Sequence, residues 1–169
     1  PAGLAVTPSG AALYVANYND NTVSVFDTSK STNTATINVG NYPRGVAAHP
    51  NGKQIWVTNQ GDGTISVIDV APNTVTATIN VGNSPVLLAF NSTGTYAYVV
   101  NGGDNTLGVV DTVLQQQVAT VKTGSSPTGV AIGGPPISIS VNAAGIVNAA
   151  SLAPKSSVAP GSLAAVFGN

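Results

Sequence analysis

The chain has 169 residues, enough for one folded domain with a core of its own. Only 7% of the residues are charged and the formal net charge is −1, which excludes a basic surface for nucleic acid or an anionic membrane. Cysteine is absent, and no run approaches the 18 apolar residues of a membrane span. We therefore expect no nucleic-acid partner and no membrane span.

A 42-residue repeat runs through most of the chain, starting from Pro1, Pro43, Pro85 and Pro127. This register predicts three repeats, 1–42, 43–84 and 85–126, and a fourth that opens over 127–132. Because the pattern is already under way at Pro1, we expect a processed chain or a fragment. The same spacing holds for Gly10, Gly52 and Gly94; for Gly40, Gly82 and Gly124; for Tyr14, Trp56 and Tyr98; for Asn17, Asn59 and Asn101; and for Asp27, Asp69 and Asp111.

Each repeat has the pattern of four short strands separated by turns, as the second repeat illustrates. Its strands are expected at 45–48, 54–59, 64–69 and 75–81. The first turn contains Asn51-Gly52, a pair that favours the positive φ angles of tight hairpins. No helical period of 3.6 residues appears between the strands. The sequence therefore predicts an all-β protein.

Four strands in a repeat of this length are typical of a β-propeller blade. The central strand 65–68 carries apolar or small residues on both sides, as expected when blades stack face to face. We predict three four-stranded antiparallel blades and one extra strand over 128–132. Since propellers close with about four to eight blades, we expect a larger or oligomerically closed propeller. The end faces would then be covered by another copy through self-association, by the C-terminal tail, or by missing blades.

Three segments resemble the YVTN signature of bacterial and archaeal β-propeller repeats: Tyr14-Val-Ala-Asn17, Trp56-Val-Thr-Asn59 and Tyr98-Val-Val-Asn101. The resemblance covers residues 1–132. It implies a propeller fold and an extracytoplasmic location, either secreted or on the cell surface. It implies no single activity, because a fold does not fix a function.

The C-terminal residues have a different composition. Residues 133–136 (Gly-Gly-Pro-Pro) are expected to form a linker. Residues 137–169 are rich in Ala, Val and Ser, and resemble a segment that follows propellers in secreted proteins of soil bacteria. That resemblance implies a β-rich tail, interpreted as the possible start of an immunoglobulin-like domain.

All six acidic residues are aspartates that occupy two repeat positions. Asp27, Asp69 and Asp111 each end a strand, so we expect them to cap the following turn through Asx hydrogen bonds. The other three lie in the loop between the second and third strands, where one carboxylate per loop is too few for Ca²⁺. Simple turn chemistry is therefore favoured for Asp20, Asp62 and Asp104.

The remaining polar candidates are also explained by the scaffold. His49 is the only histidine and is expected at a turn, because one histidine supplies neither a catalytic triad nor a zinc site. The other polar residues that break the repeat, Arg44, Lys53 and residues 115–117, form no obvious ligand set. We therefore predict no catalytic residue, no cofactor and no metal. We assign structural roles to the repeated Asn, Asp and Gly positions.

The function favoured by the sequence is a non-catalytic extracytoplasmic scaffold that binds a protein or a glycan, and not an enzyme. The alternative is a fragment of a propeller enzyme of the lactonase or lyase type, with its active site in missing blades. An active site would require residues that break the repeat, which distinguishes the two hypotheses. A single-stranded nucleic-acid binder would need a basic groove with aromatic residues, and the charge argues against it.

Overall fold

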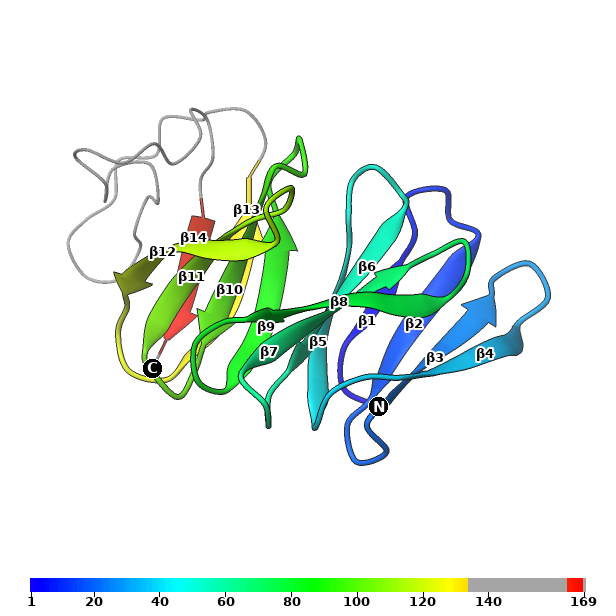
Figure 1. Cartoon of the computed structure of the whole chain (residues 1–169), viewed down its shortest axis with the longest axis horizontal. Coiled ribbons are helices and arrows are strands. Elements are labelled where there is room, and N and C mark those ends of the chain that lie inside the picture. The colour runs from blue at the N-terminus through cyan, green and yellow to red at the C-terminus, as the bar shows by residue number, and fades with distance from the viewer. Residues whose placement is uncertain (134–163, 169) are drawn as a thin grey trace.

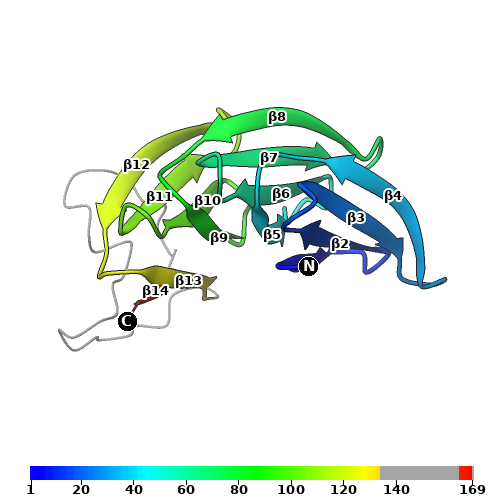
Figure 2. The ribbon, with the colours of Figure 1, turned by 90° about the horizontal axis from the view of Figure 1, so that it is seen from below.

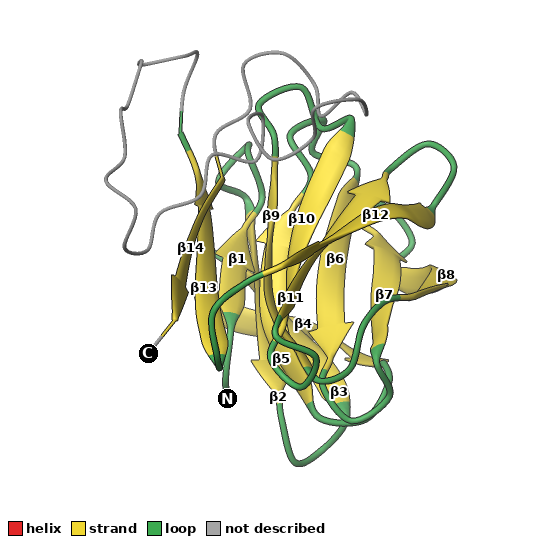
Figure 3. Cartoon of the chain, turned by 90° about the vertical axis from the view of Figure 1, so that its left-hand side faces the viewer, coloured by secondary structure: helices red, strands yellow, loops and turns green. Residues whose placement is uncertain are grey.

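The computed structural model describes residues 1–133 and 164–168, which form three four-stranded antiparallel sheets and a two-stranded ribbon (Figure 1). Each of the three sheets corresponds to one 42-residue repeat. Within this described part there is no helix, and hence none that could cross a membrane (Figure 3). The prediction of an all-β fold built from propeller blades is confirmed.

The strands of each blade follow one another in simple meander order. Blade 1 contains β1 (Leu4–Val6), β2 (Ala12–Asn17), β3 (Thr22–Asp27) and β4 (Thr32–Asn38). Blade 2 contains β5 (Pro43–Ala48), β6 (Gln54–Asn59), β7 (Thr64–Asp69) and β8 (Thr74–Asn80). Blade 3 contains β9 (Pro85–Phe90), β10 (Tyr96–Asn101), β11 (Thr106–Asp111) and β12 (Gln116–Lys122).

The blades are arranged as an arc, with β5 and β9 along its concave side and β4, β8 and β12 along its convex side (Figure 2). The first strands of neighbouring blades approach closely at glycine. A Cβ added to Gly45 would lie 2.8 Å from the Cα of Leu87 and 2.8 Å from the carbonyl oxygen of Val86. The Pro-x-Gly opening of the second repeat thus includes a glycine because the backbone of the next blade occupies the space of a side chain.

The hydrophobic core lies between the blades. We call the side of a blade that packs on the next blade its trailing face, and the opposite side its leading face. The aromatic repeat position is on the trailing face, and Tyr14, Trp56 and Tyr98 are all fully buried. At the first junction the trailing residues Tyr14, Ala16, Val23, Val25 and Ile37 pack on the leading residues Val46, Ile55, Val57 and Ile68.

The trailing face of blade 3 is covered by a strand of the fourth repeat, β13 (Pro127–Ile132). Val130 of this strand packs with Tyr98, Val100, Leu107 and Val109. β13 pairs antiparallel with β14 (Ala164–Gly168), so a piece of the C-terminal segment extends the sheet at this end of the arc. The other residues of the expected linker and tail, 134–163 and 169, lie outside the described residues.

The turns repeat as regularly as the strands. Gly10, Gly52 and Gly94 have φ angles of 75°, 72° and 75°, in the left-handed region that favours glycine. Non-glycine residues adopt this region in the connectors between blades, where φ is 54° at Tyr42, 50° at Ser84 and 51° at Ser126. The same backbone path therefore carries the chain from each blade to the next.

Candidate functional site

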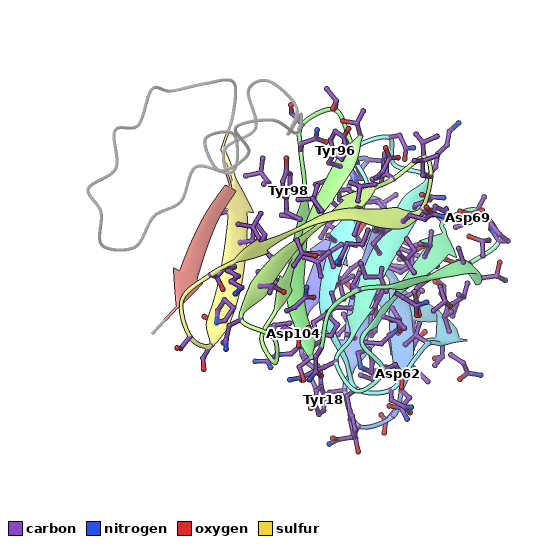
Figure 4. All side chains as sticks on the ribbon, turned by 60° about the vertical axis from the view of Figure 1, so that its left-hand side comes forward. Tyr18, Asp62, Asp69, Tyr96, Tyr98 and Asp104 are labelled. Atoms are coloured by element: carbon purple, nitrogen blue, oxygen red, sulfur yellow. The ribbon has the colours of Figure 1, made fainter. Side chains whose placement is uncertain are left out.

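The loops form two rims at opposite ends of the strands. The connector rim contains the turns at 18–21, 60–63 and 102–105 and the blade-to-blade connectors at 39–42, 81–84 and 123–126. The hairpin rim contains the other turns. Figure 4 shows Tyr18, Asp62 and Asp104 at one end of the blades, and Asp69 and Tyr96 at the other.

The repeated asparagines connect strands within a blade. The Nδ2 of Asn59 donates to Thr64 Oγ1 at 3.0 Å and to Ser66 Oγ at 2.9 Å. Asn17 makes the equivalent pair of bonds to Thr22 and Ser24. Asn101 donates to Thr106 at 3.1 Å and lacks the second bond, because Gly108 stands where the other blades have serine. These side chains hold the blade together. Among their buried polar atoms, only the Oδ1 atoms of Asn59 and Asn101 have no hydrogen-bond partner within the described part of the chain.

The aspartates that end the third strand of each blade do not all behave alike. Asp27 Oδ1 accepts hydrogen bonds from the backbone N–H groups of Ser29 and Lys30 and from the Ser29 hydroxyl. The Ser29 hydroxyl bond is the main cause that holds the pKa of Asp27 below its ordinary value. Asp111 Oδ1 caps its turn in the same way, through the N–H groups of Val113 and Leu114.

Asp69 corrects the expectation of an Asx cap in every repeat. Its Oδ1 accepts instead from the side-chain amide of Gln54 at 3.1 Å. The reason is Pro72, which has no N–H group at the position of Lys30 and Leu114. A donor from the neighbouring strand takes the place of the missing backbone donor.

Asp62 and Asp104 fasten neighbouring blades together, which also corrects the expectation of simple turn chemistry. Asp62 accepts from the backbone N–H of Asn41 at 2.7 Å and from its side-chain amide at 2.8 Å. Asp104 accepts from the backbone N–H of Asn83 at 2.6 Å. Both partners lie in the connector that leaves the preceding blade. Among the described residues, no group of three or more His, Asp or Glu side chains has the geometry to hold a metal.

A groove of about 680 Å³ lies on the hairpin rim between blades 2 and 3 and contains His49. His49 is 8% exposed, and its Nε2 lies 2.9 Å from the carbonyl oxygen of Gly94. Nε2 must donate this bond because a carbonyl can only accept. Nδ1 is then the acceptor for the N–H of Asn51 at 3.2 Å. Both ring nitrogens are occupied, so His49 is not free to act as a base.

The other polar groups of this groove are also bonded to one another. Gln54 donates to Asp69 and accepts from the indole N–H of Trp56 at 3.3 Å. Lys53 is the exposed charged residue that remains in the lining. The groove thus offers space but few unoccupied functional groups.

The connector rim carries a second set of residues that break the repeat, Tyr18, Tyr42, Arg44 and Gln60, which we call the Arg44 cluster. The rings of Tyr18 and Tyr42 are stacked with their centroids 5.0 Å apart. Arg44 Nη1 donates to Gln60 Oε1 at 3.4 Å, and the Gln60 backbone N–H donates to the Tyr42 carbonyl at 3.0 Å. Arg44 is exposed on β5, a strand of the concave side (Figure 2). The connector between blades 1 and 2 brings these residues together.

The Arg44 cluster retains free donors. A guanidinium has five N–H groups, and one of them makes the long bond to Gln60. The others are available to a carboxylate, a phosphate or a developing oxyanion. The tyrosine pair presents an apolar surface with polar edges, and Tyr42 is 48% exposed. The connector rim therefore carries free hydrogen-bond donors and an exposed aromatic surface.

Sequence reasoning identified Arg44 as non-repeating but did not group it with Tyr18, Tyr42 and Gln60. A signal was present in the repeat itself. Arg44 stands where the other repeats have Ala2 and Val86, and Tyr42 where they have Ser84 and Ser126. Sorting the residues that differ from the repeat by their position in the blade would have grouped Arg44 with Tyr42.

Comparison with known proteins bears on both the fold and the function. The family model described as "Lactonase, 7-bladed beta-propeller" matches residues 1–79. The chain is similar to the hydrazine synthase of Kuenenia stuttgartiensis, at 26% identity and a TM-score of 0.75, over 77% of this chain and 38% of that one. The chain is therefore built as part of a β-propeller. No curated protein matches it.

A second solved structure supports the fold alone. The crystal structure of a functionally unknown protein from Desulfotomaculum acetoxidans is 20% identical, with a TM-score of 0.62, over 75% of this chain and 43% of that one. This chain thus spans 38% and 43% of the two structures that it matches here.

The lactonase match contradicts the expectation of a non-catalytic scaffold and of a protein that is not an enzyme. It favours the alternative of a propeller enzyme. The expectation rested on a count of the acids and histidines in this chain, and the family match overturns it.

Proposed function

We propose that this chain is part of a propeller enzyme that hydrolyses lactones, and that the Arg44 cluster is its contribution to the substrate site. The lactonase match over residues 1–79 carries this proposal, because all four members of the cluster lie inside the matched segment. The likeness at 26% identity to a chain named as hydrazine synthase adds support for a propeller that serves an enzyme.

The chemistry of lactone hydrolysis suits the groups in the cluster. Water attacks the carbonyl carbon, the ring carbon–oxygen bond breaks, and the ring oxygen takes up a proton to give a hydroxy acid. Negative charge develops on the carbonyl oxygen, where the N–H groups of Arg44 stabilise it. The same guanidinium binds the carboxylate of the product. Tyr18 and Tyr42 cover the less polar face of the ring.

Activation of water is a role that the Arg44 cluster does not fill. We assign the general base to blades other than the three described, since the chain spans 38% of the matched hydrazine synthase chain. The Arg44 cluster then binds the lactone and polarises its carbonyl group, as one half of the active site. The present chain should therefore bind the substrate, whereas turnover requires a complete propeller.

We also infer that the blades are of the YVTN type, that residues 1–132 form one propeller unit ahead of the 133–136 linker, and that the protein acts outside the cytoplasm. The low charge and the three signature segments that end at Asn17, Asn59 and Asn101 support this inference. Fractionation of cells that produce the native protein tests it: recovery in the cytoplasmic fraction would contradict the proposed location.

Binding is the direct test of the half-site. Five- and six-membered sugar lactones and their ring-opened acids are titrated into ¹⁵N-labelled chain. We expect shifts at the Arg44 side-chain N–H, the Gln60 amide and the Tyr42 backbone N–H. Loss of bonds to a charged group costs about 1.5–3 kcal/mol, so Arg44→Ala should weaken binding roughly 10- to 100-fold.

Lys53→Ala is the matched control, since Lys53 is a cation on the opposite rim. It should leave binding unchanged. Hydrolysis is followed in a pH-stat as acid release by the native, longer protein. The proposal fails if no lactone or hydroxy acid perturbs the cluster, or if Lys53→Ala weakens binding as much as Arg44→Ala.

A further inference from the structure

A second groove, of about 410 Å³, lies at the junction of blades 1 and 2. Small-molecule sites commonly have volumes of roughly 300–1,000 Å³, so this groove has room for a ligand. Ser66 lies in its wall, opposite Val57 and Thr78 in the sheet, and therefore on the leading face of blade 2. Thr78 is exposed and belongs to β8, on the convex side of the arc (Figure 2). The groove is thus open to solvent on that side.

The wall of this groove contains a buried acceptor without a partner. Asn59 is fully buried, and its Oδ1 accepts no hydrogen bond among the described residues. Its Nδ2 donates to the hydroxyls of Thr64 and Ser66, which also line the groove. Each hydroxyl accepts one bond in this way and keeps its own hydrogen for donation. Because an unpaired buried acceptor is costly, the groove favours a ligand that carries both donors and an acceptor.

The second junction shows what can fill this place. Shifted by 42 residues, the lining of the groove is the same at every position except two, where Gln117 replaces Val75 and Gly108 replaces Ser66. The Nε2 of Gln117 donates at 2.8 Å to the hydroxyl of Thr120, which is the counterpart of Thr78. A primary carboxamide of the protein itself therefore occupies the second junction.

The two junctions complement each other in their hydrogen-bonding groups. The Oε1 of Gln117 is buried without a partner among the described residues, and it would lie 2.5 Å from a Cβ added to Gly108. The carboxamide oxygen thus lies where a serine side chain would begin. Blade 3 has the carboxamide without the serine hydroxyl. Blade 2 has the hydroxyl of Ser66 and, at Val75, no carboxamide.

We propose that the groove between blades 1 and 2 binds a small free molecule with a primary carboxamide group, in the place that Gln117 fills at the second junction. The carboxamide N–H groups donate to the Thr78 hydroxyl and to Asn59 Oδ1. The carboxamide oxygen accepts from the Ser66 hydroxyl, and Val75 contacts the apolar end of the molecule. This proposal does not rest on lactone hydrolysis.

Other classes of ligand fit the groove less well. No Lys, Arg or His of the described chain lines it, and the carboxylate of Asp62 does, so an anion is disfavoured. An ammonium ion brings donors but no acceptor for the hydroxyl hydrogens of Thr64 and Ser66. A polyol both donates and accepts through its hydroxyl groups. It is therefore the competing ligand that the experiment has to exclude.

The direct test is a titration of propionamide, which has the terminal atoms of a glutamine side chain, into the ¹⁵N-labelled full chain. We expect saturable shifts at the backbone amides of Asn59, Ser66 and Thr78, with a Kd in the millimolar range or below, as is usual for so small a ligand. Propionate and glycerol are the matched probes. Each should bind at least about tenfold more weakly, because each lacks the amide donors.

Two reciprocal double variants exchange the properties of the junctions. Ser66→Gly with Val75→Gln gives the first junction the residues of the second, and the new side chain should remove the propionamide shifts at Asn59 and Thr78. Gly108→Ser with Gln117→Val gives the second junction the residues of the first. This variant should gain a second set of saturable shifts, at Asn101 and Thr120. Both arrangements already occur in the chain, and a single melting transition checks that each variant is folded.

The proposal is overturned if propionamide causes no saturable shift in the unmodified chain, or if the variant with Val75→Gln binds it as well as the unmodified chain does. It is also overturned if glycerol or propionate binds as tightly as propionamide, or if the variant with Gln117→Val gains no second site. The tripeptide Gly-Gln-Gly tests another source of the same group. Tighter binding of this peptide than of propionamide would assign the groove to a peptide side chain and not to a free amide.

Discussion

Gly82 and its counterpart Gly124 offer a matched pair of substitutions at the blade junctions. A Cβ added to Gly82 would lie 2.4 Å from Nδ2, 2.5 Å from Cγ and 2.8 Å from Cβ of Asn101. Asn101 is fully buried and donates to Thr106, so its side chain has little room to move. Among the described residues, a Cβ added to Gly124 would meet nothing within 4 Å. The two sites therefore differ in packing and share their place in the repeat.

The cost of Gly82→Ala follows from these contacts. Overpacking a well-packed site costs about 1–3 kcal/mol, and displacing the Asn101 amide from Thr106 costs about 0.5–1.5 kcal/mol more. Replacing glycine recovers about 0.4–1 kcal/mol by restricting the unfolded chain. The net loss of about 1–3 kcal/mol corresponds to a fall in melting temperature of roughly 3–10 °C. In Gly124→Ala only the restriction of the unfolded chain applies, so this variant should raise the melting temperature by about 1–4 °C.

Urea unfolding and calorimetry on both variants test the reasoning, with Gly40→Ala as a repetition at the first junction. A Cβ at Gly40 would lie 2.5 Å from Asp62 Oδ2 and 2.6 Å from the Asn59 amide nitrogen, so this variant also disturbs the Asp62 contact. Equal stabilities for Gly82→Ala and Gly124→Ala would refute the argument. They would mean that the asparagine moves aside at no cost and that the junction is not tightly packed.

Two further predictions concern single repeats. Burial raises the pKa of Tyr14 in the folded protein. The stability that its neutral phenol contributes is therefore fully present below the ordinary pKa of 10.0 and is lost as the pH rises through the raised folded value. Tyr14→Phe should reduce the fall in melting temperature above pH 10, and it also removes the bond to Asn73. In blade 3, Gly108→Ser supplies the hydroxyl that Asn101 lacks, and Gln117→Val removes the side chain whose Oε1 would lie 2.5 Å from the added Cβ. The double variant should give Asn101 a second bond like the 2.9 Å bond from Asn59 to Ser66, and should raise the unfolding free energy by about 1–2 kcal/mol. The reverse change, Ser66→Gly, should lower the urea midpoint, and an unchanged midpoint in both variants would contradict the assignment.

The fold was predictable because its signals are local. Strand alternation and turn residues such as Asn51-Gly52 act over a few residues, and the 42-residue repeat shows each signal three times. The limits of the strands were nearly right: β6 and β7 begin and end where expected, and β5 begins at Pro43 instead of residue 45. Proline is tolerated at the first position of a strand, which explains the difference.

The roles of the aspartates were less predictable because their partners are distant in the chain. Asp62 bonds to Asn41, 21 residues upstream and in another blade. A sequence shows that position 62 is a turn, but not which connector passes over it. The prediction of a cap at Asp69 was wrong for a local reason instead, because Pro72 removes the backbone donor on which the expected cap depends.

Function in a repeat protein is best sought in the residues that depart from the repeat, but departure alone is not enough. His49, Lys53 and Gln54 depart from it and share one groove, yet His49 and Gln54 are already hydrogen-bonded within the scaffold. Arg44 departs as well, and its single contact with Gln60 at 3.4 Å leaves most of its donors free. A group that is both asymmetric and unsatisfied can act on a ligand at no cost to the fold. By this criterion the connector rim, and not the larger groove, is where substrate binding should be tested first.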